Sequence, residues 1–143
     1  MLSTDLERLE NELVAARRAA DERLSCLSEA DLEVRTEFYG GQRMVRFILY
    51  QMGRHEREHI THVKKIRQAL NAPQTEAQMI LAQNQATRGE LLAELMGLTD
   101  DELNRQPAPN EWSVRQVLEH AIQVEGRYLA AAEKALADAG AKA

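Results

Sequence analysis

The chain has 143 residues, which suits one domain with its own hydrophobic core and is too short for two ordinary domains. Hydrophobic residues make up 44% and charged residues 29%, with 7 Gly and 3 Pro, so the composition excludes a disordered or low-complexity chain. A formal net charge of -5 gives no electrostatic reason for nucleic-acid binding, and no apolar run approaches the ~20 residues that cross a bilayer. We therefore expect neither nucleic acid nor a membrane as a partner.

The start of the chain and its cysteine content bear on the cellular compartment. Residues 1–5 lack the basic and apolar regions of a secretion signal. The one cysteine, Cys26, has no disulfide partner within the chain, and we expect it to be a small apolar filler rather than a nucleophile. These features predict a reducing, cytoplasmic setting.

Apolar residues recur every three or four positions along four segments, which is the spacing of helices that bury one stripe. Aromatic residues are only 4% of the chain, and alanine and leucine dominate the apolar share, a mixture that favours helix over strand. The helix-poor stretches lie at about residues 27–41, 71–73 and 98–112. The predicted helices cover residues 4–26, 42–70, 76–97 and 114–139.

Three of these helices open with the spacing of a capping box, in which a hydroxyl accepts a hydrogen bond from an amide three residues on and the side chain there reaches back. Ser113 and Gln116 have this spacing before the last helix, Thr75 and Gln78 have it before the third, and Thr4 and Glu7 have it at the first. The caps therefore support the boundaries that the periodicity predicts.

The chain also contains a faint internal repeat. Residues 27–32 (LSEADL) mirror residues 98–103 (LTDDEL), and each copy follows a long helix and opens with a predicted cap. The Val-Arg pair at 45–46 corresponds in the same way to the Val-Arg pair at 114–115, near the start of the next helix. The sequence therefore predicts two helix–loop–helix halves.

Two such halves build an all-α, up-down four-helix bundle with an approximate two-fold axis. We expect residues 1–143 to form one domain of this kind, with halves at about 1–71 and 72–143. In that bundle the helices over 42–70 and 114–139 run parallel and lie diagonally across the core.

Three of the four histidines lie on one predicted helix. They continue its apolar stripe, whose members are three or four residues apart: Val45, Ile48, Met52, His55, His59, His62, Ile66 and Ala69. An imidazole on such a core-facing stripe loses water and needs a hydrogen-bond partner or a metal. Because His55 and His59 are one turn apart, their rings can converge on one ion.

The fourth histidine, His120, lies on the last helix, close to where the repeat places Gln51. In the predicted bundle this puts it about one turn from His55, on the diagonal helix. Two ligands from one helix and one from the other form a three-histidine face around a divalent metal and leave positions open for water or substrate. The predicted metal ligands are His55, His59 and His120.

Plainer interpretations stay open. A histidine on an apolar stripe is often only a polar residue whose hydrogen bonds are satisfied. If that holds for all the histidines, the chain is a non-catalytic scaffold or dimerisation module. His62 is a third ligand, a residue that orients a ligand, or an interior edge residue. The last two interpretations are favoured because His120 offers a ligand from a separate helix.

His55 to His59 also match the H-E-x-x-H pattern of zinc peptidases, in which the glutamate is the general base. Glu56 lies about 100° around the helix from His55, beside Arg57 and Glu58, where a solvated charged face is the simpler interpretation. No strand-like segment is present to form a substrate-binding edge, and no further ligand follows at metzincin spacing. The peptidase interpretation is therefore not favoured.

Two segments together resemble a known family. Residues 98–103 followed by 110–120 (NEWSVRQVLEH) are similar to the first half of a DinB/YfiT-like domain, in which a loop ending in tryptophan and serine precedes a helix with a metal-binding histidine. Residues 45–59 resemble the family's fourth helix, where an H-x-x-x-H pair completes the site. The resemblance implies a four-helix bundle whose ligands are His120, His55 and His59.

The two halves stand here in the opposite order from that of the family. Exchanging two similar hairpins of an up-down bundle changes one connection and few contacts, so we expect the fold to tolerate the permutation. Alternatively, the halves pair between chains in a swapped dimer. A homodimer is the predicted assembly.

The resemblance implies a metal-dependent transferase or hydrolase that acts on a small molecule. Some members of the family are transferases or isomerases that use low-molecular-weight thiols, and a thiol is the implied co-substrate. Three imidazoles accept zinc, nickel or iron(II), and the sequence does not select among these divalent ions. Arg54, Arg115 and Glu119 are either groups that orient ligand or substrate, or surface charges.

Overall fold

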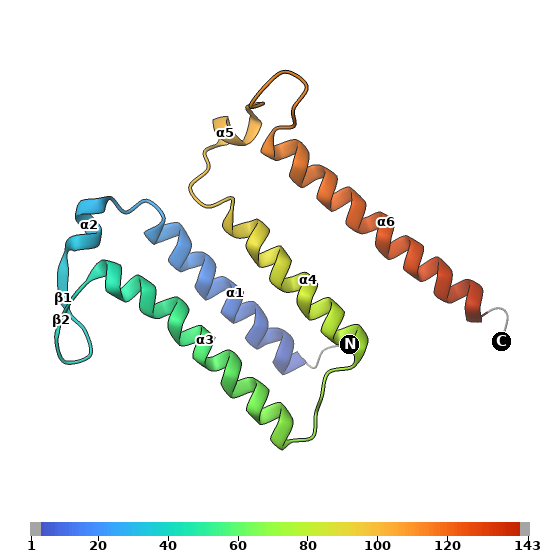
Figure 1. Cartoon of the computed structure of the whole chain (residues 1–143), viewed down its shortest axis with the longest axis horizontal. Coiled ribbons are helices and arrows are strands. Elements are labelled where there is room, and N and C mark those ends of the chain that lie inside the picture. Colours follow the sequence, from blue (N-terminus) through green and yellow to red (C-terminus); the bar gives the residue numbers. More distant parts are fainter. Residues whose placement is uncertain (1–3, 141–143) are drawn as a thin grey trace. The chain divides into compact units, whose positions relative to one another are not determined.

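The computed structural model describes residues 4–140, which are mostly helical with little sheet, as the composition predicts (Figure 1). The chain divides into two compact units, one ending at Met96 and one beginning at Gly97. The first unit contains two short strands and most of the helices: α1 (Thr4–Leu24), α2 (Glu29–Glu33), β1 (Arg35–Glu37), β2 (Gln42–Met44), α3 (Val45–Ala69) and α4 (Glu76–Ala93). The second unit contains α5 (Asp100–Asn104) and α6 (Val114–Gly140).

The four long helices lie where the periodicity predicts them. Helix α6 begins at Val114, as predicted, and α3 begins at Val45, three residues later than expected because residues 42–44 form β2. The largest difference at a C-terminus is in α4, which ends at Ala93 rather than near residue 97. The division of one domain into halves at residue 71 stays a prediction.

The expectation that no segment is strand-like is wrong. Strands β1 and β2 form an antiparallel hairpin with Thr36 opposite Arg43. The turn between them is closed by the Phe38 amide, which donates to the Gly41 carbonyl at 3.0 Å. Tyr39 and Gly40 both have positive φ, 48° and 71°, as the central residues of a type I′ turn require. Each strand has only three residues, too few for an alternating apolar pattern to be visible in the sequence.

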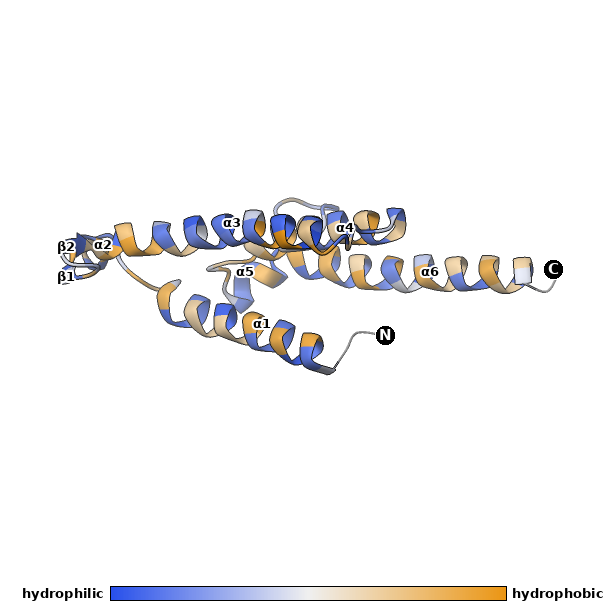
Figure 2. Cartoon of the chain, turned by 90° about the horizontal axis from the view of Figure 1, so that it is seen from below, coloured by the Kyte–Doolittle hydropathy of each residue, from blue (hydrophilic) through white to orange (hydrophobic). Residues whose placement is uncertain are grey.

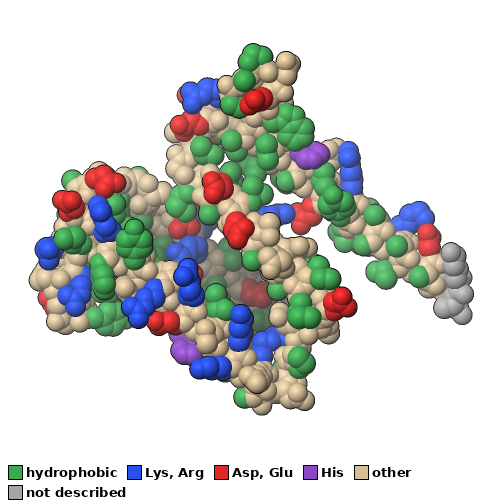
Figure 3. Space-filling model, in the orientation of Figure 1, with side chains coloured by type: hydrophobic (Ala, Val, Ile, Leu, Met, Phe, Trp, Pro, Cys, Tyr) green, Lys and Arg blue, Asp and Glu red, His purple; other side chains and the backbone are tan. Residues whose placement is uncertain are grey.

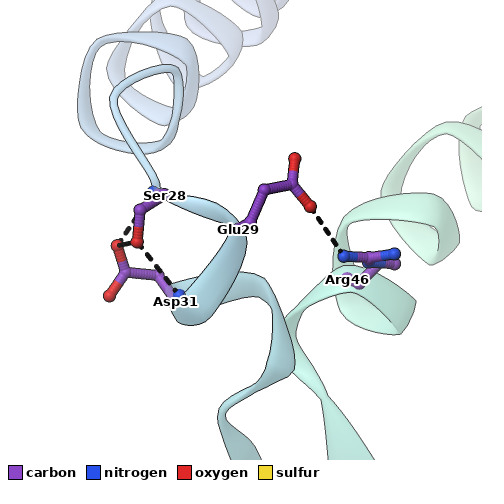
Figure 4. Close-up of polar contacts among 4 residues, drawn as sticks. All are labelled: Ser28, Glu29, Asp31 and Arg46. Atoms are coloured by element: carbon purple, nitrogen blue, oxygen red, sulfur yellow. Dashed lines mark hydrogen bonds and ion pairs between the residues drawn. The ribbon is translucent and has the colours of Figure 1, made fainter.

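The internal repeat is visible as two short helices, α2 and α5, which each follow a long helix and open with a capping box. Asp31 accepts hydrogen bonds from the Ser28 hydroxyl (2.6 Å) and backbone amide (2.9 Å), and these bonds lower the pKa of the Asp31 carboxyl (Figure 4). The backbone amide and then the hydroxyl of Thr99 lower the pKa of Glu102 in the same way. Each cap therefore favours an ionised carboxylate at the third position of its helix.

An arginine at the second position of the following long helix contacts each short helix. Arg46 of α3 forms an ion pair with Glu29 of α2 at 3.0 Å (Figure 4). Arg115 of α6 donates a hydrogen bond to the Asn104 side chain of α5. The Val-Arg correspondence seen in the sequence thus has a structural counterpart in both units.

Two of the three predicted capping boxes, at Ser113 and at Thr75, are confirmed, and the third, at Thr4 and Glu7, stays a prediction. The Gln116 amide donates to Ser113 Oγ at 3.3 Å, and the Ser113 amide donates to Gln116 Oε1 at 2.9 Å. Thr75 and Gln78 exchange the equivalent pair of bonds at the start of α4. The starts of α4 and α6 are therefore set by contacts within four residues of each boundary.

The apolar stripes of the long helices are covered only in part. Among the described residues no apolar side chain is buried, and Ser113 is the one residue that is, at 5% exposure. Figure 2 shows hydrophobic and hydrophilic residues alternating along the helices, and Figure 3 shows apolar side chains at the surface. Within residues 4–140, no helix is both long and apolar enough to cross a membrane.

Candidate metal-binding histidines

Three histidine rings lie in a row along α3. The Nε2 atoms of His55 and His59 are 3.2 Å apart, and their ring centroids are 4.3 Å apart with the planes 78° from parallel. The ring of His59 also contacts that of His62, with 3.4 Å between their Nδ1 atoms. The spacing of three and four residues thus brings the rings together, as the sequence predicts.

The separation of the first two rings fits a shared metal ion. Two nitrogen atoms that each bind one zinc ion at ~2.0–2.1 Å lie about 3.3 Å apart in tetrahedral coordination. The Nε2 atoms of His55 and His59 lie 3.2 Å apart without any change of rotamer. This separation is compatible with a two-histidine chelate on one face of a helix, and it is also that of a hydrogen bond between the two rings.

The histidine rings are exposed, although the stripe position predicts that they face a core. The reason is that the C-terminal part of the stripe is uncovered: Ile66, one turn beyond His62, is 56% exposed. The imidazole side chains are therefore accessible to solvent.

The charged residues between the histidines form a solvated face, as expected. Glu56 forms an ion pair with Arg17 of α1 at 2.5 Å, and Arg54 pairs with Glu58 one turn along α3 at 3.2 Å. Both pairs are exposed, and such pairs contribute little to stability. Glu56 is thus engaged by a guanidinium, which does not favour its use as the general base of a peptidase.

A groove lies beside the histidine pair, between the N-terminal half of α3 and the hairpin. Its volume is about 530 Å³, in the range of small-molecule sites, and His55 is part of its wall. Its apolar wall is formed by Phe38, Phe47, Ile48 and Met52. The guanidinium of Arg43 lies 5.6 Å from the centre of the Phe47 ring. No sequence motif indicated the groove, because part of its wall is built by Phe38, Tyr39 and Arg43 of the hairpin.

His120 lies in the second unit, on α6. Its ring makes an edge contact with the indole of Trp112, with centroids 4.9 Å apart and planes 68° from parallel. An open hollow of about 500 Å³ runs past both rings and is lined further by Gln116, Glu119 and Gln123. The contact brings together two residues of the segment on which the family resemblance rests, but their pairing was not predicted, because Trp112 precedes the helix.

The remaining candidates are surface groups. Arg115 lies 3.9 Å from Glu119, one turn along α6, so these two charges pair with each other. Cys26 is exposed and its sulfur lies 3.8 Å from the Arg23 carbonyl oxygen. The expectation that Cys26 fills apolar space is therefore not met, because Cys26 lies in an exposed turn that follows α1.

Two of the three predicted ligands, His55 and His59, are brought together. The third, His120, belongs to the other unit. No cluster of three or more histidine, cysteine or acidic side chains able to hold a metal occurs in residues 4–140. The three-histidine site thus stays a prediction.

Comparison with known proteins bears on the C-terminal part of the chain. Residues 83–143, somewhat less than half of the chain, match the model of the DinB superfamily. A stretch of 38 residues is 45% identical to the uncharacterized protein YuaE of Bacillus subtilis (strain 168), covering 27% of this chain and 24% of that protein. The chain thus spans about a quarter of the length of this relative. No solved structure matches the chain significantly.

Proposed function

We propose that this chain, which is a DinB-like protein by its match over residues 83–143, is a metal-dependent transferase or hydrolase of small molecules. The observation that carries the proposal is the 3.2 Å separation of the His55 and His59 Nε2 atoms, which suits one shared divalent ion. His120 is the proposed third ligand. Three imidazoles suit zinc, nickel or iron(II).

A metal on three histidines with an open position lowers the pKa of a bound water or binds a thiolate. The residues of this chain supply the remaining parts of such a site. The groove beside His55 has room for a small substrate, and its apolar wall suits the organic part of that molecule. A low-molecular-weight thiol is the co-substrate that the family resemblance implies.

The arrangement we propose for the long helices is the up-down four-helix bundle. Four long helices are present, α4 and α6 open with capping boxes, and each of the four carries exposed apolar side chains that need cover. The pairing of each short helix with the next long helix supports two equivalent halves. In such a bundle α3 and α6 are diagonal, which would direct His120 toward the His55–His59 pair.

Thiol turnover tests the enzymatic part of the proposal. Untagged protein loaded with zinc, nickel or iron(II) is mixed with a low-molecular-weight thiol and an electrophile, and loss of free thiol is followed with time. We expect turnover with at least one metal, its loss on treatment with a chelator and its return when that metal is restored. Equal rates before and after chelation, for all three metals, would show that the protein is not this kind of enzyme.

The assembly we propose is a homodimer that forms through the face of α6 opposite His120. Ile122, Leu129 and Leu136 recur every seven residues and are 70%, 60% and 74% exposed. Leu129 lies nine residues after His120, which at ~100° per residue is the opposite side of the helix. A helix face that binds metal inside a bundle therefore leaves this row facing outward. A row repeated every seven residues suits pairing with the same row of a second copy.

A charge in this row tests the dimer. We expect Leu129→Glu to convert the dimer to a monomer because it places two carboxylates in an apolar contact between copies. The measurement is the molar mass by light scattering after size exclusion, with Gln123→Glu as a control that adds the same charge off the row. A wild-type monomer, or a dimer that survives Leu129→Glu, rules out this interface. A stable dimer without bound metal favours the alternative function, a non-catalytic dimerisation module.

A further inference from the structure

The third histidine of the row on α3 has no assigned role in the proposed metal site. His62 approaches His59 through its Nδ1 atom, 3.4 Å from the Nδ1 atom of His59. The atom of His59 that faces His55 is the other ring nitrogen, Nε2. His59 is therefore contacted on both nitrogens, by a different histidine at each.

This arrangement argues against His62 as a third ligand. A ligand has to direct a nitrogen toward the point that the Nε2 atoms of His55 and His59 share. His62 instead contacts the opposite nitrogen of His59, and the described residues contain no three-ligand cluster. The contact has the geometry of a hydrogen bond between rings, and it lies at the ring nitrogen of His59 that does not face His55.

The tautomer of His59 explains what this contact can do. A neutral imidazole that binds a metal through Nε2 carries its one proton on Nδ1 and needs an acceptor there. Nδ1 of His62 can accept that proton if His62 carries its own proton on Nε2, and exposure of the His62 ring lets water accept from that Nε2–H. With the proton of His59 on Nδ1, the lone pair of its Nε2 atom is directed toward His55.

We propose that His62 is a positioning residue, which accepts a hydrogen bond from Nδ1–H of His59 and so presets the tautomer and ring orientation in which Nε2 of His59 binds metal. The proposal rests on the function proposed above for His55 and His59. It concerns residues of one helix, so it does not depend on how the helices pack. Partners of this kind typically change metal affinity by ~10–100-fold.

Two measurements on His62 variants test the proposal. In metal-free protein, nitrogen-15 NMR of the histidine rings reports which nitrogen of His59 carries the proton. We expect Nδ1–H in the wild type and in His62→Gln, whose amide oxygen keeps an acceptor, and a larger share of Nε2–H in His62→Ala. In a Co²⁺ titration of untagged protein we expect His62→Ala to bind about tenfold more weakly. His62→Gln should recover most of that loss, and Gln68→Ala, on the same helix, should match the wild type.

The outcomes separate this proposal from the proposed function. If Co²⁺ binds to wild type and is lost in His55→Ala, but His62→Ala binds as tightly as wild type, only the role of His62 is wrong. If wild-type protein binds no Co²⁺, the metal function is wrong, and the NMR measurement still decides whether His62 sets the His59 tautomer. Nε2–H on His59 in the wild type would overturn the role of His62 in either case.

Discussion

Replacing His55 with alanine is expected to remove the divalent metal from the protein. Untagged wild-type protein should carry about one ion per chain, bound through His55, His59 and His120. His55→Ala deletes one arm of the 3.2 Å nitrogen pair, so metal affinity should fall by more than the ~10–100-fold typical of losing an outer partner. Metal content after dialysis, measured by mass spectrometry, checks this expectation.

His120→Ala decides whether the site draws on the second unit. If three imidazoles hold the ion, this variant should lose metal as His55→Ala does. If α3 alone binds it, as in the peptidase interpretation, His120→Ala keeps the ion. Glu56→Gln is the matched control, because Glu56 pairs with Arg17 and should leave metal content unchanged. Metal retained by His120→Ala would remove that histidine from the site.

Replacing Ile66 with alanine is expected to destabilise the protein strongly if the apolar stripe of α3 becomes a bundle core. A buried isoleucine cut back to alanine costs ~2–5 kcal/mol of unfolding free energy, through lost burial and a cavity. At the 56% exposure seen here, the same change would fall within about 0.5 kcal/mol. Urea unfolding followed by circular dichroism gives the difference, and an unchanged slope keeps the comparison valid.

Ile60 provides a control of the same residue type on the same helix. It is 55% exposed, nearly identical to Ile66, but lies about 120° away around the helix and off the stripe. Ile60→Ala should therefore change stability by less than about 1 kcal/mol. Equal, small effects of both substitutions would contradict the proposed bundle, because no face of α3 would then be a core.

The long helices could be predicted from sequence because their signals are local. Periodicity and capping boxes operate within four residues, and the start of α6 after Ser113 follows from them. The short helices α2 and α5 have five residues each, less than two turns, so they show no period. The β1–β2 hairpin could not be predicted for a related reason. Its strands have three residues each and are joined by the turn at Tyr39 and Gly40.

In the candidate site, too, a contact within one helix could be predicted, whereas a contact that depends on a loop could not. The approach of His55 to His59 was predictable because a spacing of four residues on a helix fixes it. The edge contact of Trp112 with His120 was not, because it depends on the path of the loop before α6. Exposure of the rings was also missed, since an apolar stripe shows which face needs cover but not what covers it.

The capping boxes of this chain bear on whether its pairs of helices can be reordered or exchanged between molecules. Each box closes within a single turn, from Ser28 to Asp31 as from Ser113 to Gln116, and borrows nothing from a distant segment. The starts of the capped helices thus do not depend on the surface that each helix meets, whereas the start of α3 is held by the Val45 amide, which donates to the Val34 carbonyl at 2.9 Å. Rearranging the order of the helix pairs, or exchanging one pair between two molecules, therefore leaves the capped boundaries in place and alters mainly the apolar contacts.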